Sequence, residues 1–296
     1  MVLAAGVAQA DVSFSGTAGV ALIDDNGARD AATAATAAPT SYGTDMFFES
    51  YYDFDITASA ESDNGVSVSL GFDMGAGSKI DYNDDDKLEA QGNGIGDADV
   101  SVGYMGWSLT VDHGGIDNLF DDASQQDYKI AGTVAGWGVA VTGDQSESTS
   151  SYSISGNVAG VALTITGTDV AAVGGDASKI AASYNMGNGL TLSASSQDED
   201  GTAEDDATVG FSYAMDALTV GYTSIQPGGK SFGDEWDLSL KYSAGAMVAS
   251  FAIDEADATT IIADYALGGG ASAFAAMHDK AGTADDLTTV GLNFAF

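Results

Sequence analysis

The chain has 296 residues, and its 44 acidic residues outnumber its 8 basic residues, which gives a formal net charge of −36. This balance argues against nucleic acid and anionic lipid surfaces as partners, because both are bound by lysine and arginine, and the absence of cysteine excludes disulfide scaffolds, thiolate catalysis and Cys-based zinc sites. With 45% hydrophobic residues, the chain is also too apolar for a disordered acidic protein.

The first ten residues differ from the rest of the chain. They read MVLAAGVAQA, a short apolar run with the Ala-x-Ala ending that signal peptidase cuts. A basic region before the apolar run is missing, so residues 1–10 are interpreted as the remnant of a signal peptide, with Asp11 as the mature start. An ordinary apolar N-terminus is the alternative. No later stretch of 18 or more apolar residues exists, which excludes a transmembrane helix.

Alternation of apolar and polar residues dominates the chain from Asp11 onward. Residues 66–74 place Val66, Val68, Leu70, Phe72 and Met74 on one face and serine, glycine and aspartate on the other. The same period of two recurs around residues 100–111, 180–184, 236–242 and 290–296. This pattern predicts β-strands with one apolar and one polar side.

The connections between these runs alternate between two kinds. Short, mostly glycine-containing turns fall at 63–65, 105–106, 135–136, 160, 187–189, 216–217, 244–245 and 268–270, and longer acidic loops at 24–42, 79–94, 114–127, 198–206, 225–234 and 281–286. The count is 18 strands, or 16 if one weak hairpin is not formed. Sorting short turns to one end is typical of membrane barrels and not of soluble sandwiches. We therefore predict an all-β fold in which residues 11–296 form one transmembrane, antiparallel, up-and-down β-barrel with short periplasmic turns and longer external loops.

Aromatic residues support a lipid-facing surface. The apolar face carries a tyrosine or tryptophan close to a short turn at Tyr104, Trp107, Trp137, Tyr184, Tyr213, Tyr242 and Tyr265. A cluster at one rim is expected of an aromatic girdle at a membrane interface. The alternative, tyrosine chosen only for its strand propensity, predicts scatter along the strands.

If the apolar face meets lipid, the polar face lines a lumen. The inward positions then include Glu49, Asp53, Asp55, Asp73, Asp99 and Asp112, and the loop at 114–127 adds Asp117, Asp121 and Asp122. The plausible counter-charge nearby is Lys129. A pore lined by one sign of charge attracts counter-ions and repels co-ions, which predicts cation selectivity. The simpler alternative is that the acids only keep the lumen wet.

The sequence resembles the general diffusion porins of Gram-negative outer membranes, most closely the alphaproteobacterial kind. The resemblance rests on the opening strand from Asp11, on the glycine-rich hairpins, on the segment Asp117-Asn-Leu-Phe-Asp-Asp122 and on the last strand, which ends in Phe296. It implies that segment 114–127 folds into the pore as its constriction. It also implies a homotrimer that passes small hydrophilic solutes, and a terminal Phe296 that outer-membrane assembly machinery reads as a signal.

Two features depart from that family. Its members usually have 16 strands, and they set a cluster of arginines opposite the acidic loop. This chain has one arginine, Arg29 in the first long loop, and its inward basic candidates are Lys129, Lys179 and Lys241 on different strands. A transverse field across the constriction is therefore not expected with the strength found in the family.

Other chemistry is weakly supported. His113 and His278 are expected to point outward near strand ends without a serine or carboxylate partner, so we predict no enzyme and no required cofactor. The acid runs Asp84, Asp85, Asp86 and Glu204, Asp205, Asp206 fit either external Ca²⁺ sites, which could bridge to lipopolysaccharide, or solvated charge. The competing function is a secreted or surface-layer, acidic, calcium-binding β-protein without a pore.

Overall fold

The computed structural model describes residues 10–24, 46–80, 82, 88–90, 98–146, 148–169, 176–199, 206–228, 230–279 and 286–296. Its strands are β1 (Ala10–Asp24), β2 (Met46–Glu61), β3 (Ser67–Ile80), β4 (Leu88–Ala90), β5 (Asp99–Tyr104), β6 (Trp107–Asp117), β7 (Ser124–Val134), β8 (Trp137–Gly143), β9 (Ser150–Val158), β10 (Val161–Asp169), β11 (Ala177–Asn185), β12 (Leu190–Glu199), β13 (Asp206–Met215), β14 (Leu218–Gln226), β15 (Glu235–Ala244), β16 (Met247–Asp254), β17 (Thr259–Gly268), β18 (Ala271–Asp279) and β19 (Leu287–Ala295). Within these residues, no helix is long and apolar enough to cross a membrane.

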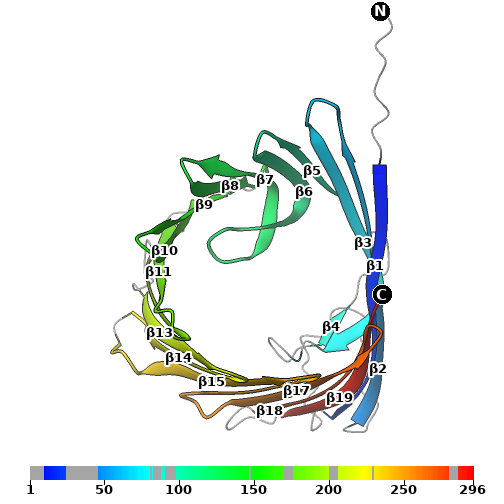
Figure 1. Ribbon diagram of the computed structural model, residues 1–296, viewed down its shortest axis with the longest axis vertical. Coiled ribbons are helices and arrows are strands. Elements are labelled where there is room, and N and C mark those ends of the chain that lie inside the picture. The colour runs from blue at the N-terminus through cyan, green and yellow to red at the C-terminus, as the bar shows by residue number, and fades with distance from the viewer. Residues whose placement is uncertain are drawn as a thin grey trace, which may run out of the picture.

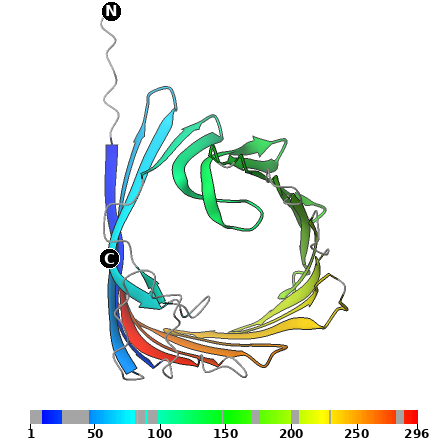
Figure 2. The ribbon, with the colours of Figure 1, turned by 180° about the vertical axis from the view of Figure 1, so that it is seen from behind.

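The strands form one closed antiparallel barrel (Figures 1 and 2). Each strand of the wall pairs with its neighbours in the sequence, and β1 closes the ring by pairing with both β2 and β19. The short strand β4 pairs only with the end of β3, while β5 takes the next place in the wall. Over the described residues the wall therefore has 18 strands, which confirms the predicted count and excludes the alternative of 16. Pairing of β1 with β19 removes the two free edges that an open sheet would have at the ends of this wall.

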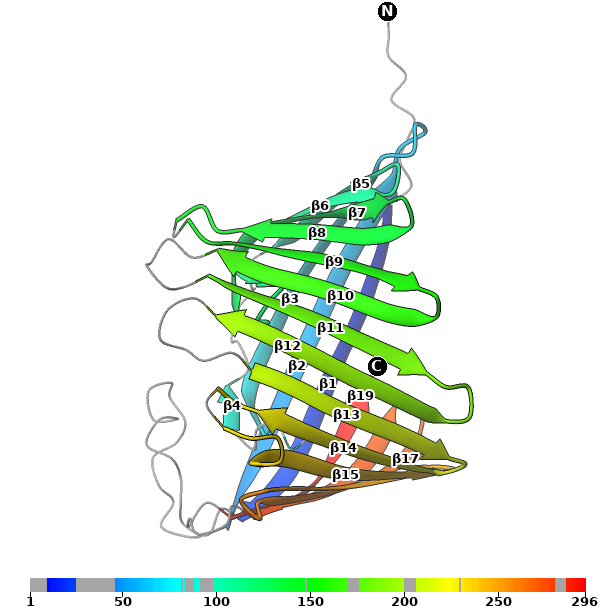
Figure 3. The same cartoon turned by 90° about the vertical axis from the view of Figure 1, so that its left-hand side faces the viewer.

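The short turns lie together at one end of the barrel (Figure 3). In the turns Met105-Gly106, Ala135-Gly136 and Ala159-Gly160, both residues have positive φ, between 50° and 88°. Such paired left-handed residues are the mark of type I′ hairpins, whose twist matches that of the flanking strands. The second residue is glycine in each case because it adopts this conformation without steric cost.

The outer face of the barrel is apolar, with an aromatic rim near the short turns. Five rim tyrosines, Tyr104, Tyr184, Tyr213, Tyr242 and Tyr265, expose 36–52% of their surface. Trp107 packs over Gly132 and Trp137 over Gly156, where a β carbon on either glycine would collide with the indole ring. Aromatic residues thus recur on the outer face at most of the successive hairpins, as the girdle interpretation predicts.

The barrel closes where β1 meets β19. Beyond β19, the backbone N–H of Phe296 donates to the carbonyl of Gly16 at 3.1 Å, and the N–H of Gly16 donates back to the carbonyl of Phe296 at 3.1 Å. The Phe296 ring stacks on Phe54, which stacks in turn on Phe14, with centroids 6.4 and 5.9 Å apart. The last residue of the chain therefore belongs to the closing seam.

One part of the inner wall is apolar rather than polar. Ile23, Phe47, Ile262, Phe274 and Leu287 are at most 8% exposed and form one cluster with Ala276 and Tyr82. The register places this face inward. Ile261 and Met277 are paired with each other on the other face of the sheet, which is the outer face, and they are exposed by 43% and 41%. The predicted outward position of His278 is therefore wrong: it follows Phe274 and Ala276 on the inner face and is 2% exposed.

Candidate functional site: the barrel lumen

The predicted pore-lining acids share the inner face of neighbouring strands. Asp55 of β2 lies directly opposite Asp73 of β3, and Asp99 of β5 lies opposite Gly71. The outward pair Ile56 and Phe72 fixes the orientation, since side chains alternate along a strand. Glu49 and Asp53 follow on the same face of β2, opposite Ala21 and Thr17 of β1.

Asp55 and Asp73 form a like-charged cross-strand pair. Directly opposite residues have β carbons about 4.5–5.5 Å apart, so two carboxylates there repel each other. Ser15 donates to Asp55 at 3.4 Å, and within the described residues neither aspartate forms an ion pair. Like charges placed directly opposite each other on a sheet are destabilising, and both carboxylates of this pair lie on the water-facing inner wall.

Asp112 has a different setting from the other wall acids. Its carboxylate lies against Gly115, where a β carbon would collide with it. Asp112 therefore lies close to the backbone of Gly115, within the stretch of β6 where regular pairing with β7 is interrupted.

Sequence reasoning missed three further inward acids. Asp237 of β15 lies directly opposite Asp254 of β16, and Asp264 of β17 lies opposite Phe274. The signal was present in the alternation: the outward residues Leu238 and Leu240 force Asp237 inward. A second like-charged pair thus lies on another part of the wall, at the end of β16, where Asp254 Oδ1 also accepts the N–H groups of Ala256 and Ala258, each at 2.9 Å.

The inward lysines are far apart in the ring. Lys129 lies opposite Thr142, Lys179 opposite Gln197, and Lys241 opposite Ser250, on β7, β11 and β15. A hollow of about 260 Å³ around Lys179 is lined mostly by alanine, serine and threonine of β10–β13. That wall is therefore nearly neutral, whereas the wall from β2 to β6 is acidic.

The hairpin of β6 and β7 bends into the lumen (Figures 1 and 2). Regular pairing from Ser108 to Val111 is interrupted and resumes only at Ile116 opposite Gln126. Gly114, at φ 78°, lies within this interruption, and its N–H donates to Asp127 at 3.1 Å. The predicted loop 114–127 is therefore mostly strand, and the turn itself spans 118–123.

Hydrogen bonds anchor the tip of this hairpin to the wall at β9 and β10. The N–H of Leu119 donates to Ser151 Oγ at 2.8 Å, and Asn118 Nδ2 donates to Thr168 Oγ1 at 3.1 Å. Gln126 Nε2 donates to Thr149 Oγ1 at 3.1 Å. Asn118, Gln126 and Ser151 are at most 5% exposed, so water does not compete for these bonds.

The three acids of this hairpin are exposed. Asp117 ends β6, Asp122 occupies a left-handed position at φ 58°, and Asp121 Oδ1 accepts the N–H of Ala123 at 3.1 Å. They therefore carry charge on the surface of the tip while its neutral residues make the anchoring contacts.

We expect Ser151→Ala to loosen the hairpin. The substitution leaves the part-buried N–H of Leu119 without its acceptor and the buried hydroxyl of Thr142 without its partner, and each loss costs about 1–3 kcal/mol. The temperature at which the folded barrel unfolds on a heat-modifiability gel should fall. Ser155→Ala, on the same face of β9 but exposed, is the matched control and should leave that temperature unchanged. Equal behaviour of the two variants would contradict the anchoring role.

Most of the predicted calcium ligands, Asp84, Asp85, Asp86, Glu204 and Asp205, lie outside the described residues. Asp206 is described, and its Oδ1 accepts the N–H of Gly228 at 3.0 Å. Across the described ranges, no group of three or more His, Asp or Glu side chains is placed to hold a metal ion.

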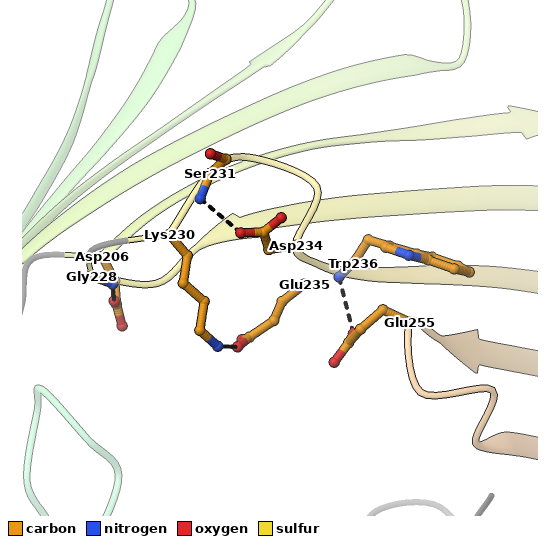
Figure 4. A network of polar contacts seen from close by, with 8 residues as sticks. All are labelled: Asp206, Gly228, Lys230, Ser231, Asp234, Glu235, Trp236 and Glu255. Atoms are coloured by element: carbon orange, nitrogen blue, oxygen red, sulfur yellow. Dashed lines mark hydrogen bonds and ion pairs between the residues drawn. The ribbon is translucent and has the colours of Figure 1, made fainter.

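Acids at the long-loop end bind neighbouring backbone and one lysine (Figure 4). Glu255 accepts the N–H of Trp236 at 3.1 Å, and Asp234 accepts that of Ser231 at 3.0 Å. Lys230 Nζ donates to Glu235 at 2.7 Å, and this hydrogen bond raises the pKa of Lys230 above its usual value. These acids thus connect the β14–β15 loop to its neighbours.

Comparison with known proteins agrees with this geometry. A family model described as Gram-negative porin matches residues 1–293. Among solved structures, a triple mutant of Rhodopseudomonas blastica porin is 19% identical and another mutant of the same porin is 20% identical. Each match has a TM-score of 0.58 and covers 97% of this chain and 100% of the other. A comparison with curated proteins finds no match.

Proposed function

We propose that this chain forms a cation-selective pore. The chain belongs to the Gram-negative porin family and is a diffusion porin of the bacterial outer membrane. The family and the fold are those of a channel rather than an enzyme. Membership of this family sets aside the alternative of a secreted or surface-layer β-protein without a pore. Water, small hydrophilic solutes and ions pass through the lumen of such a barrel.

One observation carries the proposed selectivity: carboxylates face each other across neighbouring strands on the inner wall. Asp55 and Asp73 form one such pair and Asp237 and Asp254 another. Two carboxylates placed directly opposite each other give a high local density of negative charge, which attracts cations to the wall. The inward lysines Lys129, Lys179 and Lys241 lie on separate strands.

The reversal potential in a salt gradient tests the selectivity. With the protein in a planar bilayer and a tenfold KCl gradient, an ideally cation-selective pore approaches about 59 mV. The potential should be large and of the cationic sign when the gradient is centred near 0.01 M, where the Debye length is about 30 Å, and small near 1 M, where it is about 3 Å. A zero or anionic potential in dilute salt would overturn the proposal.

The partners of this chain belong to the same proposal. By analogy with the family we assign it a homotrimeric state, contact with lipopolysaccharide and delivery by the outer-membrane assembly machinery, which would read Phe296. Calcium at the external acid runs remains a prediction. Chelation by EDTA, followed by size-exclusion chromatography in detergent, would show whether a divalent ion holds the assembly together.

A further inference from the structure

A second segment enters the lumen, at a different part of the wall from the β6–β7 hairpin (Figures 1 and 2). Beyond Gly77, the end of β3 pairs with β4 instead of β5. Gly77 has φ 99°, and a β carbon there would collide with the carbonyl oxygen of Ser50. Glycine thus permits β3 to continue to Ile80, where it pairs with β4, and Tyr82 lies two residues beyond its end.

Tyr82 is fixed on the inner wall by three contacts. Its ring stacks on Phe274 with centroids 4.3 Å apart and an interplanar angle of 2°. Its hydroxyl donates to Asp264 Oδ1 at 3.2 Å and accepts from Asn293 Nδ2 at 3.2 Å. Asn293 also accepts from Tyr51 at 3.2 Å. The direct partners of Tyr82 come from β18, β17 and β19, and Tyr51 of β2 is linked to it through Asn293. One side chain thus connects the inner segment to several strands.

The wall beneath Tyr82 explains why the segment stays there. It consists of the apolar cluster of Ile23, Phe47, Ile262, Phe274, Ala276 and Leu287, and Tyr82 itself is 6% exposed. In a water-filled lumen these side chains would otherwise face solvent, and burying apolar surface is favourable. The segment therefore has a complementary surface on the barrel wall.

We propose that Tyr82 is a size-determining residue of the pore. It holds the end of β3 and the strand β4 against the wall, and the passage is then bounded by these two strands and by the β6–β7 hairpin. Neutral solutes are filtered by the space between two anchored segments rather than by one loop. This inference rests on the proposed channel function.

Two substitutions of Tyr82 separate its ring from its hydroxyl. Tyr82→Ala removes both and releases the end of β3 and β4 from the wall into the lumen. Single-channel conductance in 1 M KCl, where wall charge is screened, should therefore fall about twofold as the passage narrows. Liposome swelling with neutral oligosaccharides should show a smaller size limit. Tyr82→Phe keeps the stack and should lie between Tyr82→Ala and the unmodified protein. Tyr184→Ala, an outward tyrosine of the rim, is the control and should change neither quantity.

A thiol probe reports on the segment independently of conduction. The chain has no cysteine, and Ala276 is 4% exposed within the covered cluster. The thiol of Ala276→Cys should react slowly with a hydrophilic thiosulfonate reagent, and adding Tyr82→Ala should accelerate the reaction at least tenfold.

The outcomes are distinct. Channels with an unchanged or larger conductance and size limit in Tyr82→Ala, or an unchanged thiol reaction rate in a barrel that folds normally on a heat-modifiability gel, would overturn the role of Tyr82. Absence of any channel activity in the unmodified protein would instead overturn the channel function on which the inference rests.

Discussion

We expect deletion of Phe296 to remove most of the folded barrel from the outer membrane. The residue makes two backbone hydrogen bonds with Gly16 and stacks on Phe54, so its loss shortens the seam between β1 and β19. Backbone groups left unpaired in lipid cost several kcal/mol each, which penalises an incompletely closed barrel. The amount of heat-modifiable protein in outer-membrane fractions measures the effect.

Phe48→Ala is the matched control for this deletion. Phe48 also points outward and is 84% exposed, but it lies near the long-loop end of β2, away from the seam. Its removal should leave the folded fraction near that of the unmodified protein. Insertion of the Phe296 deletion at the unmodified level would show that neither the seam contact nor a terminal signal at this residue is needed.

Replacing Asp55 and Asp73 by asparagine is expected to weaken cation selectivity and, at the same time, to stabilise the barrel. The change removes two negative charges from the acidic wall, so the reversal potential in dilute KCl should fall strongly towards zero. Because like charges directly opposite each other destabilise a sheet by about 0.2–1 kcal/mol, the unfolding temperature should rise. These opposite effects distinguish charges that serve conduction from charges that serve the fold.

Asp121→Asn combined with Asp122→Asn provides the comparison. These side chains are exposed at the hairpin tip, and asparagine keeps the oxygen with which Asp121 accepts the N–H of Ala123. Selectivity should fall here too, without a gain in unfolding temperature, since no carboxylate lies directly opposite either residue in the strand register. Loss of stability in the Asp55 and Asp73 variant would contradict the like-charge interpretation.

Local pattern was enough to predict the barrel and most of its orientation. Alternation with a period of two assigns each side chain to one face, so the outward Val68 and the inward Asp55 and Asp73 could be derived from their neighbours. The short glycine turns predicted the hairpins because positive φ is a local requirement. The count of 18 followed from these two signals without any knowledge of long-range contacts.

The inner surface could be predicted only in part. Ile262 lies between Thr260 and Asp264 on the inner face, and this break in the alternation was a visible signal of covered wall. The residue that covers this apolar wall could not be predicted from neighbouring residues. Tyr82 and Phe274 are 192 residues apart in the chain and come into contact only in the closed barrel. For the same reason His278 was assigned to the wrong face.

The anchoring of the β6–β7 hairpin also required the tertiary structure. The sequence showed the acids Asp117, Asp121 and Asp122, but the bonds that hold the tip are made by neutral Asn118 and by Ser151 of a later strand. Sequence alone therefore determined the barrel, its two faces and the sign of its charge, because these depend on local periodicity and composition. Only the tertiary structure shows which inward segments contact the wall, because those contacts join residues that are far apart in the sequence and come close only when the barrel closes.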